Sequence, residues 1–411
     1  MIYNESKYNK SWSVDKLNEL GDFSRGKSKH RPRNDERLFV DGKYPFIQTG
    51  DIKDANLYIK NHTQEYGEFG LKQSKLWNKG TLCITIAANI AETAILSYPA
   101  CFPDSVVGFN AYESKSSEIF MYYVFEYIKA SIQNAASGSI QDNINIDYLT
   151  TLNFKIPEKK YQDTIVALLG AIDKKIISNN DINDNLEQQA KLLYDYWFTQ
   201  FDFPDENGLP YKASGGKMMW NDTLKRKIPL NWCVSSMTNI FTFESGYPFS
   251  SDLYHSNGKY KLLTIKNVQN NGINLNIDSY INNLPSNMPD YCLLNINDIL
   301  MSLTGNVGRI GIMYAENCLL NQRVALAKPN KKEWNSFVYF LLKSDIVHKQ
   351  YETLANGSSQ QNLSPIEAGN VTIAFDKNVV DQYSAICEKH LSTIVRNLAE
   401  NQELSNLRDW L

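Results

Sequence analysis

The stretch YQDTIVALLGAIDKKIISNNDINDNLEQQAKLLYDYWFTQF, residues 161–201, decides the fold of this chain. It contains no proline and only one glycine. Its apolar residues recur at alternating steps of four and three, which is the period of a helix that packs along a seam. Asn179 and Asn183 occupy the same register between two apolar blocks. We predict one helix of about forty residues, roughly 60 Å long, and a spacer helix fits that length better than a core helix of one large domain.

A second amphipathic helix is predicted at the C-terminal end, over residues 379–411. Because each helix has an apolar face to bury, we expect the two to pack against each other as an antiparallel pair. The predicted seam consists of apolar positions of both helices, namely Ile165, Leu169, Ile172, Ile176, Leu186, Leu193, Ile394 and Leu398.

Length and composition describe an ordinary globular protein. The chain has 411 residues, enough for two or three domains, with 43% apolar residues and a net charge of −3. Any nucleic-acid partner would therefore be met by local basic patches. Six scattered cysteines without a C-x-x-C pair argue against a zinc site or a disulfide framework. With no signal peptide and no apolar run of membrane-spanning length, we expect a cytoplasmic protein.

The chain contains an internal repeat whose two copies are offset by about 216–220 residues. GKYPFIQTGDI at 42–52 returns as GKYKLLTIKNV at 258–268, and GTLCITIAANIAETAIL at 80–96 returns as NDILMSLTGNVGRIGIM at 297–313. SWSVDKLNEL at 11–20 and ASGSIQDNI at 136–144 also have counterparts, at 228–240 and 355–363. Four matches in one order at a nearly constant offset indicate a tandem repeat.

The predicted fold is α+β. Two similar mixed α/β domains are separated by a pair of long, antiparallel, coiled-coil-like helices with pseudo-twofold symmetry. In the first domain we predict strands over 12–17, 44–52, 81–87, 95–97 and 153–156, and a helix over 119–132. The expected segments are a first mixed domain at 1–158, a long helix at 159–200, a linker at 201–227, a second mixed domain at 228–377 and a C-terminal helix at 378–411.

A basic loop at residues 24–37, SRGKSKHRPRNDER, is the first candidate for DNA contact. Lysine and arginine on a loop can reach phosphates, and arginine can also form two hydrogen bonds with guanine. The alternative is a solvated surface loop. The second copy, SGYPFSSDLYHSNGK at 245–259, has lost this basic character. The candidate residues of the loop are Arg25, Lys27, Lys29, Arg31 and Arg33.

Two polar turns and one strand-turn segment complete the candidates. Amide side chains can read adenine, and the NH groups of a small-residue turn can hold phosphate, although such turns can also simply align elements at a helix junction. The candidate residues of the turns are Ser139, Gln141, Asn143, Ser358, Ser359, Gln360 and Gln361. Those of the strand-turn segments are Asn89, Thr304, Asn306, Arg309 and Arg323.

The two-copy layout, the TGNVGRIG turn at 304–311, the GSSQQNL turn at 357–363 and the central run at 156–198 together resemble the DNA-specificity (S) subunits of type I restriction–modification systems. The resemblance implies that each mixed domain reads one half of a split DNA target. It also implies that the helices set the half-site spacing and dock two methyltransferase (M) subunits, through which two restriction (R) subunits join. No cofactor is expected in this chain, because S-adenosylmethionine would belong to the M subunits and ATP and Mg²⁺ to the R subunits.

Two departures from that family pattern are visible. The first-half counterpart of TGNVGRIG is IAANIAET, which has alanines for glycines and no arginine, so Arg309 has no partner there. The chain also ends at Leu411, where the family's second helix usually continues.

Catalysis by this chain is the alternative hypothesis. No N-P-P-[YF] tetrapeptide and no G-x-x-x-x-G-K-[ST] phosphate loop occurs. A nuclease-like pattern, Pro103-Asp104…Glu113-x-Lys115, could hold Mg²⁺, but its residue types are common and its spacing is short. A non-DNA interaction scaffold is the third possibility. We predict a non-catalytic DNA reader.

Overall fold

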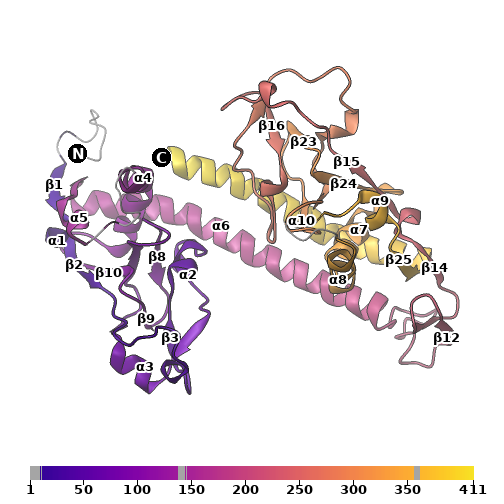
Figure 1. The fold of residues 1–411 in the computed structure, drawn as a ribbon, viewed down its shortest axis with the longest axis horizontal. Coiled ribbons are helices and arrows are strands. Elements are labelled where there is room, and N and C mark those ends of the chain that lie inside the picture. Colours follow the sequence, from indigo (N-terminus) through magenta and orange to yellow (C-terminus); the bar gives the residue numbers. More distant parts are fainter. Residues whose placement is uncertain (1–9, 11, 138–143, 145, 356–361) are drawn as a thin grey trace. The chain divides into compact units, whose positions relative to one another are not determined.

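The computed structural model describes residues 10, 12–137, 144, 146–355 and 362–411 (Figure 1). The chain divides into two compact units, Met1–Lys174 and Lys175–Leu411. The boundary lies inside helix α6, Lys159–Tyr194, so α6 contributes to both units. No helix among the described residues is long and apolar enough to cross a membrane.

The predicted long helices are both present. α6 is followed by a π-helical turn, Asp195–Thr199, where the predicted helix was expected to continue to residue 201. Trp197 and Phe198 of this turn are buried in the core of the second unit. α10 spans Lys377–Trp410, and the Asp376 carboxylate accepts hydrogen bonds from the first backbone NH groups of the helix.

The first unit contains three sheets. The largest has the order β2-β10-β7-β8-β4, the second β5-β3-β9-β6, and β1 pairs with β11. The strands are β1 Ser13–Lys16, β2 Gly21–Arg25, β3 Tyr44–Phe46, β4 Tyr58–Ile59, β5 Gln64–Tyr66, β6 Leu76–Trp77, β7 Leu82–Thr85, β8 Thr93–Leu96, β9 Ala100–Cys101, β10 Val106–Ala111 and β11 Asn153–Ile156. The helices before α6 are α1 Leu17–Leu20, α2 Thr49–Lys53, α3 Glu68–Gln73, α4 Glu118–Ser137 and α5 Ile146–Thr151.

One local prediction is wrong. The strand expected over 44–52 ends at Phe46, and α2 begins at Thr49. The Asp51 carboxylate accepts a hydrogen bond from the backbone NH of Gln48 at 2.8 Å, which closes the first turn of a helix. This local bond outweighs the apolar pattern of the segment.

The second unit repeats this topology. Its sheets have the orders β15-β24-β21-β22 and β19-β16-β23-β20, with β14 paired to β25. The corresponding strands are β14 Cys233–Ser236, β15 Phe241–Ser245, β16 Tyr260–Leu263, β19 Tyr280–Ile281, β20 Leu293–Leu294, β21 Ile299–Ser302, β22 Ile310–Ile312, β23 Cys318–Leu320, β24 Val324–Pro329 and β25 Thr372–Phe375. The remaining elements are hairpin strands β12 Met218–Asn221, β13 Arg226–Pro229, β17 Val268–Gln269 and β18 Gly272–Ile273, and helices α7 Asn335–Leu342, α8 Asp345–Leu354 and α9 Pro365–Gly369.

The strand orders confirm the repeat. β3 pairs in parallel with β9 and antiparallel with β5, and β16 makes the same two kinds of pair with β23 and β19. A parallel pair inside an otherwise antiparallel sheet requires the same crossover in both copies. The two halves therefore share one topology, and this topology places equivalent segments at equivalent edges.

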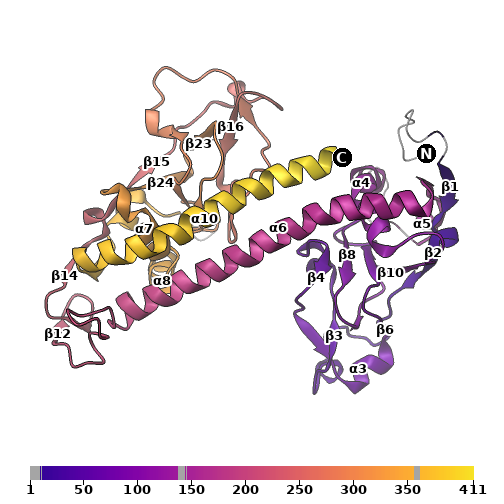
Figure 2. The ribbon, with the colours of Figure 1, turned by 180° about the vertical axis from the view of Figure 1, so that it is seen from behind.

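Within the second unit, α10 and the end of α6 run antiparallel, side by side in both views (Figures 1 and 2). Asn179 donates to Asn401 at 2.9 Å, and Asn397 donates to Asn183 at 2.8 Å. Asn179 and Asn397 are separated by the repeat offset, and so are Asn183 and Asn401. The two amide pairs are thus twofold equivalents of each other. Asn179, Asn183 and Asn397 are buried, so the polar middle of the helix is a hydrogen-bonded layer of the pair.

Candidate nucleic-acid interface

The turns after β7 and β21 have the same backbone geometry. In each, a hydroxyl at the strand end accepts a hydrogen bond from a backbone NH seven residues later and donates to a carbonyl four residues later. Thr85 does this with Glu92 and Asn89, and Ser302 with Arg309 and Asn306. These turns are the counterparts recognised in the sequence as IAANIAET and LTGNVGRI.

The structure explains why glycine and alanine exchange in these turns. Gly305 and Gly308 have φ values of 74° and 76°, and their counterparts Ala88 and Ala91 have φ values of 64° and 61°. Alanine adopts this left-handed conformation only at a cost, whereas glycine does not. The first half therefore keeps the same turn at a conformational cost that the glycines of the second half avoid, while the hydroxyls of Thr85 and Ser302 tie the two turns in the same way.

Hydrogen bonds bring further candidate segments to each turn. Ile86 donates its NH to Ser105 and accepts from Ile144, which follows the first polar turn. Leu303 makes the same two backbone hydrogen bonds, with Arg323 and Leu363. In both halves three segments thus meet at one edge of the larger sheet. They are the turn after β7 or β21, the start of β10 or β24, and the residue that follows the polar turn. The strand-turns and the polar turns were predicted separately, and the strand β10 that joins them in the first half was not predicted.

The loop that follows β2 joins the same edge. Gly26 donates its NH to Val106, and Gly246 of the second half donates to Val324. A Cβ at Gly26 would lie 2.3 Å from the carbonyl oxygen of Phe102, and one at Gly246 would lie 2.2 Å from that of Asn321. Both loops must therefore leave the sheet at a glycine, a requirement that sequence analysis did not find.

Arg31 and Arg33 of the basic loop have acidic neighbours. Arg33 Nη2 lies 2.7 Å from Asp104 Oδ1, and Arg31 Nη2 lies 4.0 Å from Asp104 Oδ2. All three side chains are about half exposed, at 54%, 52% and 42% for Arg31, Arg33 and Asp104. Exposed pairs of this kind are weak, so a phosphate could replace the carboxylate. Asp104 directly precedes Ser105, so the loop reaches the edge described above.

Asp35 organises the far end of the loop. Arg37 and His30 both bind its carboxylate, each at 2.7 Å. The hydrogen bonds from Arg37 and then from His30 hold the pKa of Asp35 well below its usual range. This carboxylate stays charged, and its contacts with His30 and Arg37 hold the far end of the loop together.

The basic loop expected over 24–37 begins only at Gly26, because Ser24 and Arg25 belong to strand β2 and pair with β10. Arg25, Lys27 and Lys29 are exposed and have no ion pair within the described part of the chain. Lys75, which sequence analysis missed, lies with its ammonium 3.4 Å from the centre of the Trp77 ring. Burial, and then the charge of Lys27, lower the pKa of Lys75. No local sequence signal could have found Lys75, because it lies outside the basic loop and far from Lys27 in the sequence.

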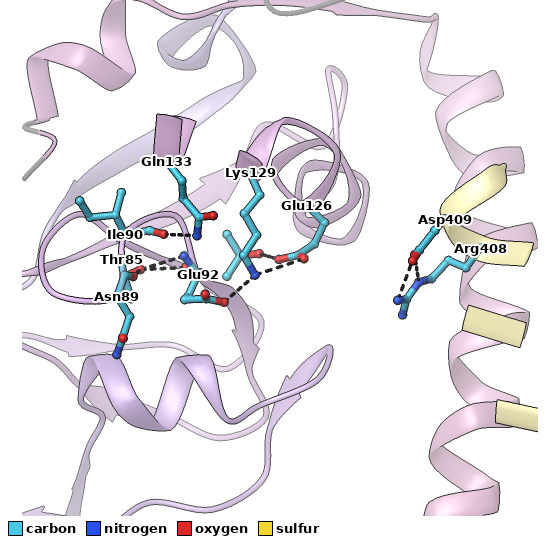
Figure 3. A network of polar contacts seen from close by, with 10 residues as sticks. Thr85, Asn89, Ile90, Glu92, Glu126, Lys129, Gln133, Arg408 and Asp409 are labelled. Carbon is cyan, nitrogen blue, oxygen red and sulfur yellow. Dashed lines mark hydrogen bonds and ion pairs between the residues drawn. The ribbon is translucent and has the colours of Figure 1, made fainter. Parts of the chain in front are cut away.

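The two turns carry opposite charges. In the first half Glu92 Oε2 binds Lys129 of α4 at 2.6 Å, and Glu126 lies 3.6 Å from the same ammonium (Figure 3). In the second half the residue equivalent to Glu92 is Arg309. In the amide orientation that satisfies its hydrogen bonding, Asn306 accepts from the Arg309 guanidinium at 2.9 and 3.3 Å.

Other predicted residues have mixed outcomes. Arg323 and Asn306 are exposed at the second edge, whereas Asn89 and Thr304 are half-buried beside their turns. Seven candidates lie outside the described residues, namely Ser139, Gln141, Asn143, Ser358, Ser359, Gln360 and Gln361.

Some of the predicted seam residues pack on the hydrophobic core of the first unit and others on that of the second unit. Ile165 and Leu169 pack on the core of the first unit, and Leu193 and Leu398 on that of the second. Ile172 and Ile394 are buried, and Ile176 and Leu186 are half-buried.

The nuclease hypothesis gains no support from the geometry. Asp104, its first carboxylate, is paired with Arg33. Within the described residues, no group of three or more His, Cys, Asp or Glu side chains could hold a metal ion.

Comparison with known proteins identifies the family. Residues 9–188 and 229–367 match the model of the type I restriction modification DNA specificity domain. The chain is 22% identical over 411 residues to the type I restriction enzyme MjaIX specificity subunit of Methanocaldococcus jannaschii, covering 98% of this chain and 92% of that protein. It is also 22% identical over 462 residues to the HindI specificity subunit of Haemophilus influenzae, covering 95% and 96%.

A crystal structure of the type I restriction–modification S subunit from M. genitalium has the same fold. Its TM-score is 0.58 at 17% identity, with 99% of this chain and 96% of that one covered. The chain belongs to the family of type I restriction–modification DNA-specificity subunits. Such a subunit is the non-catalytic member of its restriction enzyme.

Proposed function

We propose that each half of this specificity subunit reads one half of a two-part DNA target. The observation that carries the proposal is the shared backbone edge with different side chains in the two copies. Equivalent edges would meet DNA in equivalent ways, while different residues would read different bases. In the first half the contact falls to the loop of Arg25, Lys27, Lys29, Arg31 and Arg33, and in the second to Asn306, Arg309 and Arg323.

The chemistry of the second edge suits guanine or phosphate. A guanidinium can form two hydrogen bonds with guanine O6 and N7 in the major groove. The Asn306 amide fixes the plane of Arg309, which lowers the entropy that the side chain loses on binding. The polar turns at 137–143 and 356–362 remain proposed contacts, because the described residues next to them join the same edges.

Selection from a library of random duplexes tests this function. The full chain, assembled with its methyltransferase partner, should enrich two short half-sites separated by a fixed number of unspecified bases. Enrichment of one contiguous site would contradict the proposal.

The long helix is proposed to set the gap between the half-sites. α6 has 36 residues in one continuous helix, about 54 Å at 1.5 Å per residue. Inserting seven residues after Lys174 would add about 10.5 Å, close to three base pairs, while turning the following residues by only about 20°. The selected gap should widen by about three base pairs, and an unchanged gap would contradict the proposed ruler.

Partner subunits would supply the chemistry. We propose that α6 and α10 dock two M subunits, and that R subunits join through them. S-adenosylmethionine would then be bound by the M subunits, and ATP and Mg²⁺ by the R subunits. Co-purification of the M subunit with the full chain, and its loss on replacement of exposed residues of α6, would test the docking.

A further inference from the structure

The first half carries a carboxylate where the second half carries an arginine, on the same turn. We propose that Glu92 withholds Lys129 from DNA, so that the turn at 85–92 makes no phosphate contact while the turn at 302–309 does. This inference rests on the proposed function and assigns unequal roles to the two equivalent turns.

The contacts of Lys129 support this assignment. Its ammonium lies between two carboxylates, 2.6 Å from Glu92 and 3.6 Å from Glu126 (Figure 3). The Thr93 hydroxyl donates to the other oxygen of Glu126 at 2.7 Å, which holds that carboxylate in place. The side chains of Lys129 and Glu92 are only 26% and 17% exposed, so solvent screens their attraction less than that of a surface pair. With two carboxylates and one ammonium, the group has a net charge of −1.

The turn itself is also fixed toward α4. Gln133, one turn further along α4, donates to the carbonyl of Ile90 at 2.9 Å. The Thr85 hydroxyl accepts a hydrogen bond from the backbone NH of Glu92 at 2.9 Å, which fixes the position of the Glu92 backbone. The Glu92 carboxylate therefore reaches Lys129 from a turn that is tied down on both sides, and DNA would meet a negative group here.

The second turn offers the opposite charge. Within the described part of the chain Arg309 has no ion pair, and the uncharged amide of Asn306 accepts hydrogen bonds from its guanidinium. A phosphate or guanine can therefore approach Arg309 without displacing a carboxylate. The Glu92 group carries a charge of −1 and the Arg309 side chain a charge of +1, on two turns that share one hydrogen-bond pattern.

Salt dependence of DNA binding by the full complex tests the inference. Each phosphate neutralised by a cation adds about 0.9 to the slope of log affinity against log salt concentration. Glu92→Gln should release Lys129, steepen the slope by about one unit and raise affinity by roughly three- to tenfold at 0.1 M salt. Lys129→Gln should leave the slope of the parental complex unchanged. The double variant Glu92→Gln/Lys129→Gln should also have the parental slope. Arg309→Gln should make it shallower by about one unit.

Two results would overturn the inference. A shallower slope for Lys129→Gln would mean that Lys129 already contacts DNA, and an unchanged slope for Glu92→Gln would mean that its release adds no contact. Thermal melting confirms that each variant is folded, and Glu92→Ser serves as a second route to releasing Lys129. The slopes are measured on duplexes with and without the target, so they stay interpretable even if the parental complex shows no two-part target, a result that would contradict the proposed function instead.

Discussion

The loops that leave the two sheets at Gly26 and Gly246 begin in the same way and then differ. The first follows Arg25, the last residue of β2, and continues through Lys27 and Lys29. The second folds onto its own domain, where Phe249 is buried and its ring lies 4.9 Å from that of Tyr247. The backbone contacts that start a loop are therefore separate from the side chains that it presents. In this fold the backbone scaffold and the exposed side chains can therefore differ independently.

The largest expected effect is a loss of folding stability at the two equivalent glycines where the loops leave the sheets. Gly26→Ala and Gly246→Ala each place a Cβ within 2.3 Å of a backbone carbonyl oxygen. We expect each to destabilise its own half by about 2–4 kcal/mol, because backbone must move to make room. Gly50→Ala, where nothing lies within 4 Å of the added Cβ, is the control. Thermal and urea unfolding of the variants measure the effect, and a large difference between Gly26 and Gly246 would break the equivalence.

The next largest effect is a loss of DNA affinity when the basic residues that only the first half carries are replaced. Replacing Arg25, Lys27 and Lys29 together with glutamine should lower DNA affinity about ten- to hundredfold and make the salt slope shallower by two to three units. Lys266→Gln in the second half is the control, since that lysine is 78% exposed and paired with Asp278. Fluorescence anisotropy at several salt concentrations measures both quantities. Equal effects from the two halves would mean that the basic loop has no special role.

The helix pair allows a finer comparison. Asn183→Leu leaves the Asn397 amide without its acceptor, and Asn397→Leu leaves Asn183 without its donor. Each should cost about 1–3 kcal/mol, as expected for a buried polar group that loses its partner. The double variant should cost less than the sum of the two. Strict additivity in a double-mutant cycle would show that the two amides are not coupled.

The smallest expected effect is a dependence of the melting temperature on pH, caused by Glu400. Hydrogen bonds from Asn179 and then Lys175 lower the pKa of Glu400 below its usual value. Glu400 therefore contributes stability that is present above the pKa of the unfolded chain and is lost as the pH falls through the lower folded pKa. The melting temperatures of the parental chain and of Glu400→Gln should differ by about one degree at pH 7 and converge as the pH falls through the folded pKa of Glu400. A difference that grows as the pH falls would contradict this.

Local patterns in the sequence predicted much of this fold. The period of residues 161–201 predicted α6, and the matched segments predicted the repeat and hence equivalent sheets. Asn179 and Asn183 were visible as a polar interval, although their partners on α10 were not. The basic loop was found from its charge alone.

The contacts that give the edges their charge could not be predicted in this way. Asp104 meets Arg33 from 71 residues away, and Glu92 meets Lys129 from 37 residues away. Such pairs depend on which strands become neighbours, and no periodicity records them. For the same reason, the close approach at Gly26 became visible only once β2 lay beside β10.

The most direct test of the two-reader account compares base selection by the parental complex with that of Arg31→Ala/Arg33→Ala. Both complexes are assembled from the full chain and its methyltransferase partner and offered the same random duplex library. The account predicts that the variant loses selectivity in one half-site and keeps the other half-site and the gap unchanged. Equal loss in both half-sites, or unaltered selection in both, would contradict it.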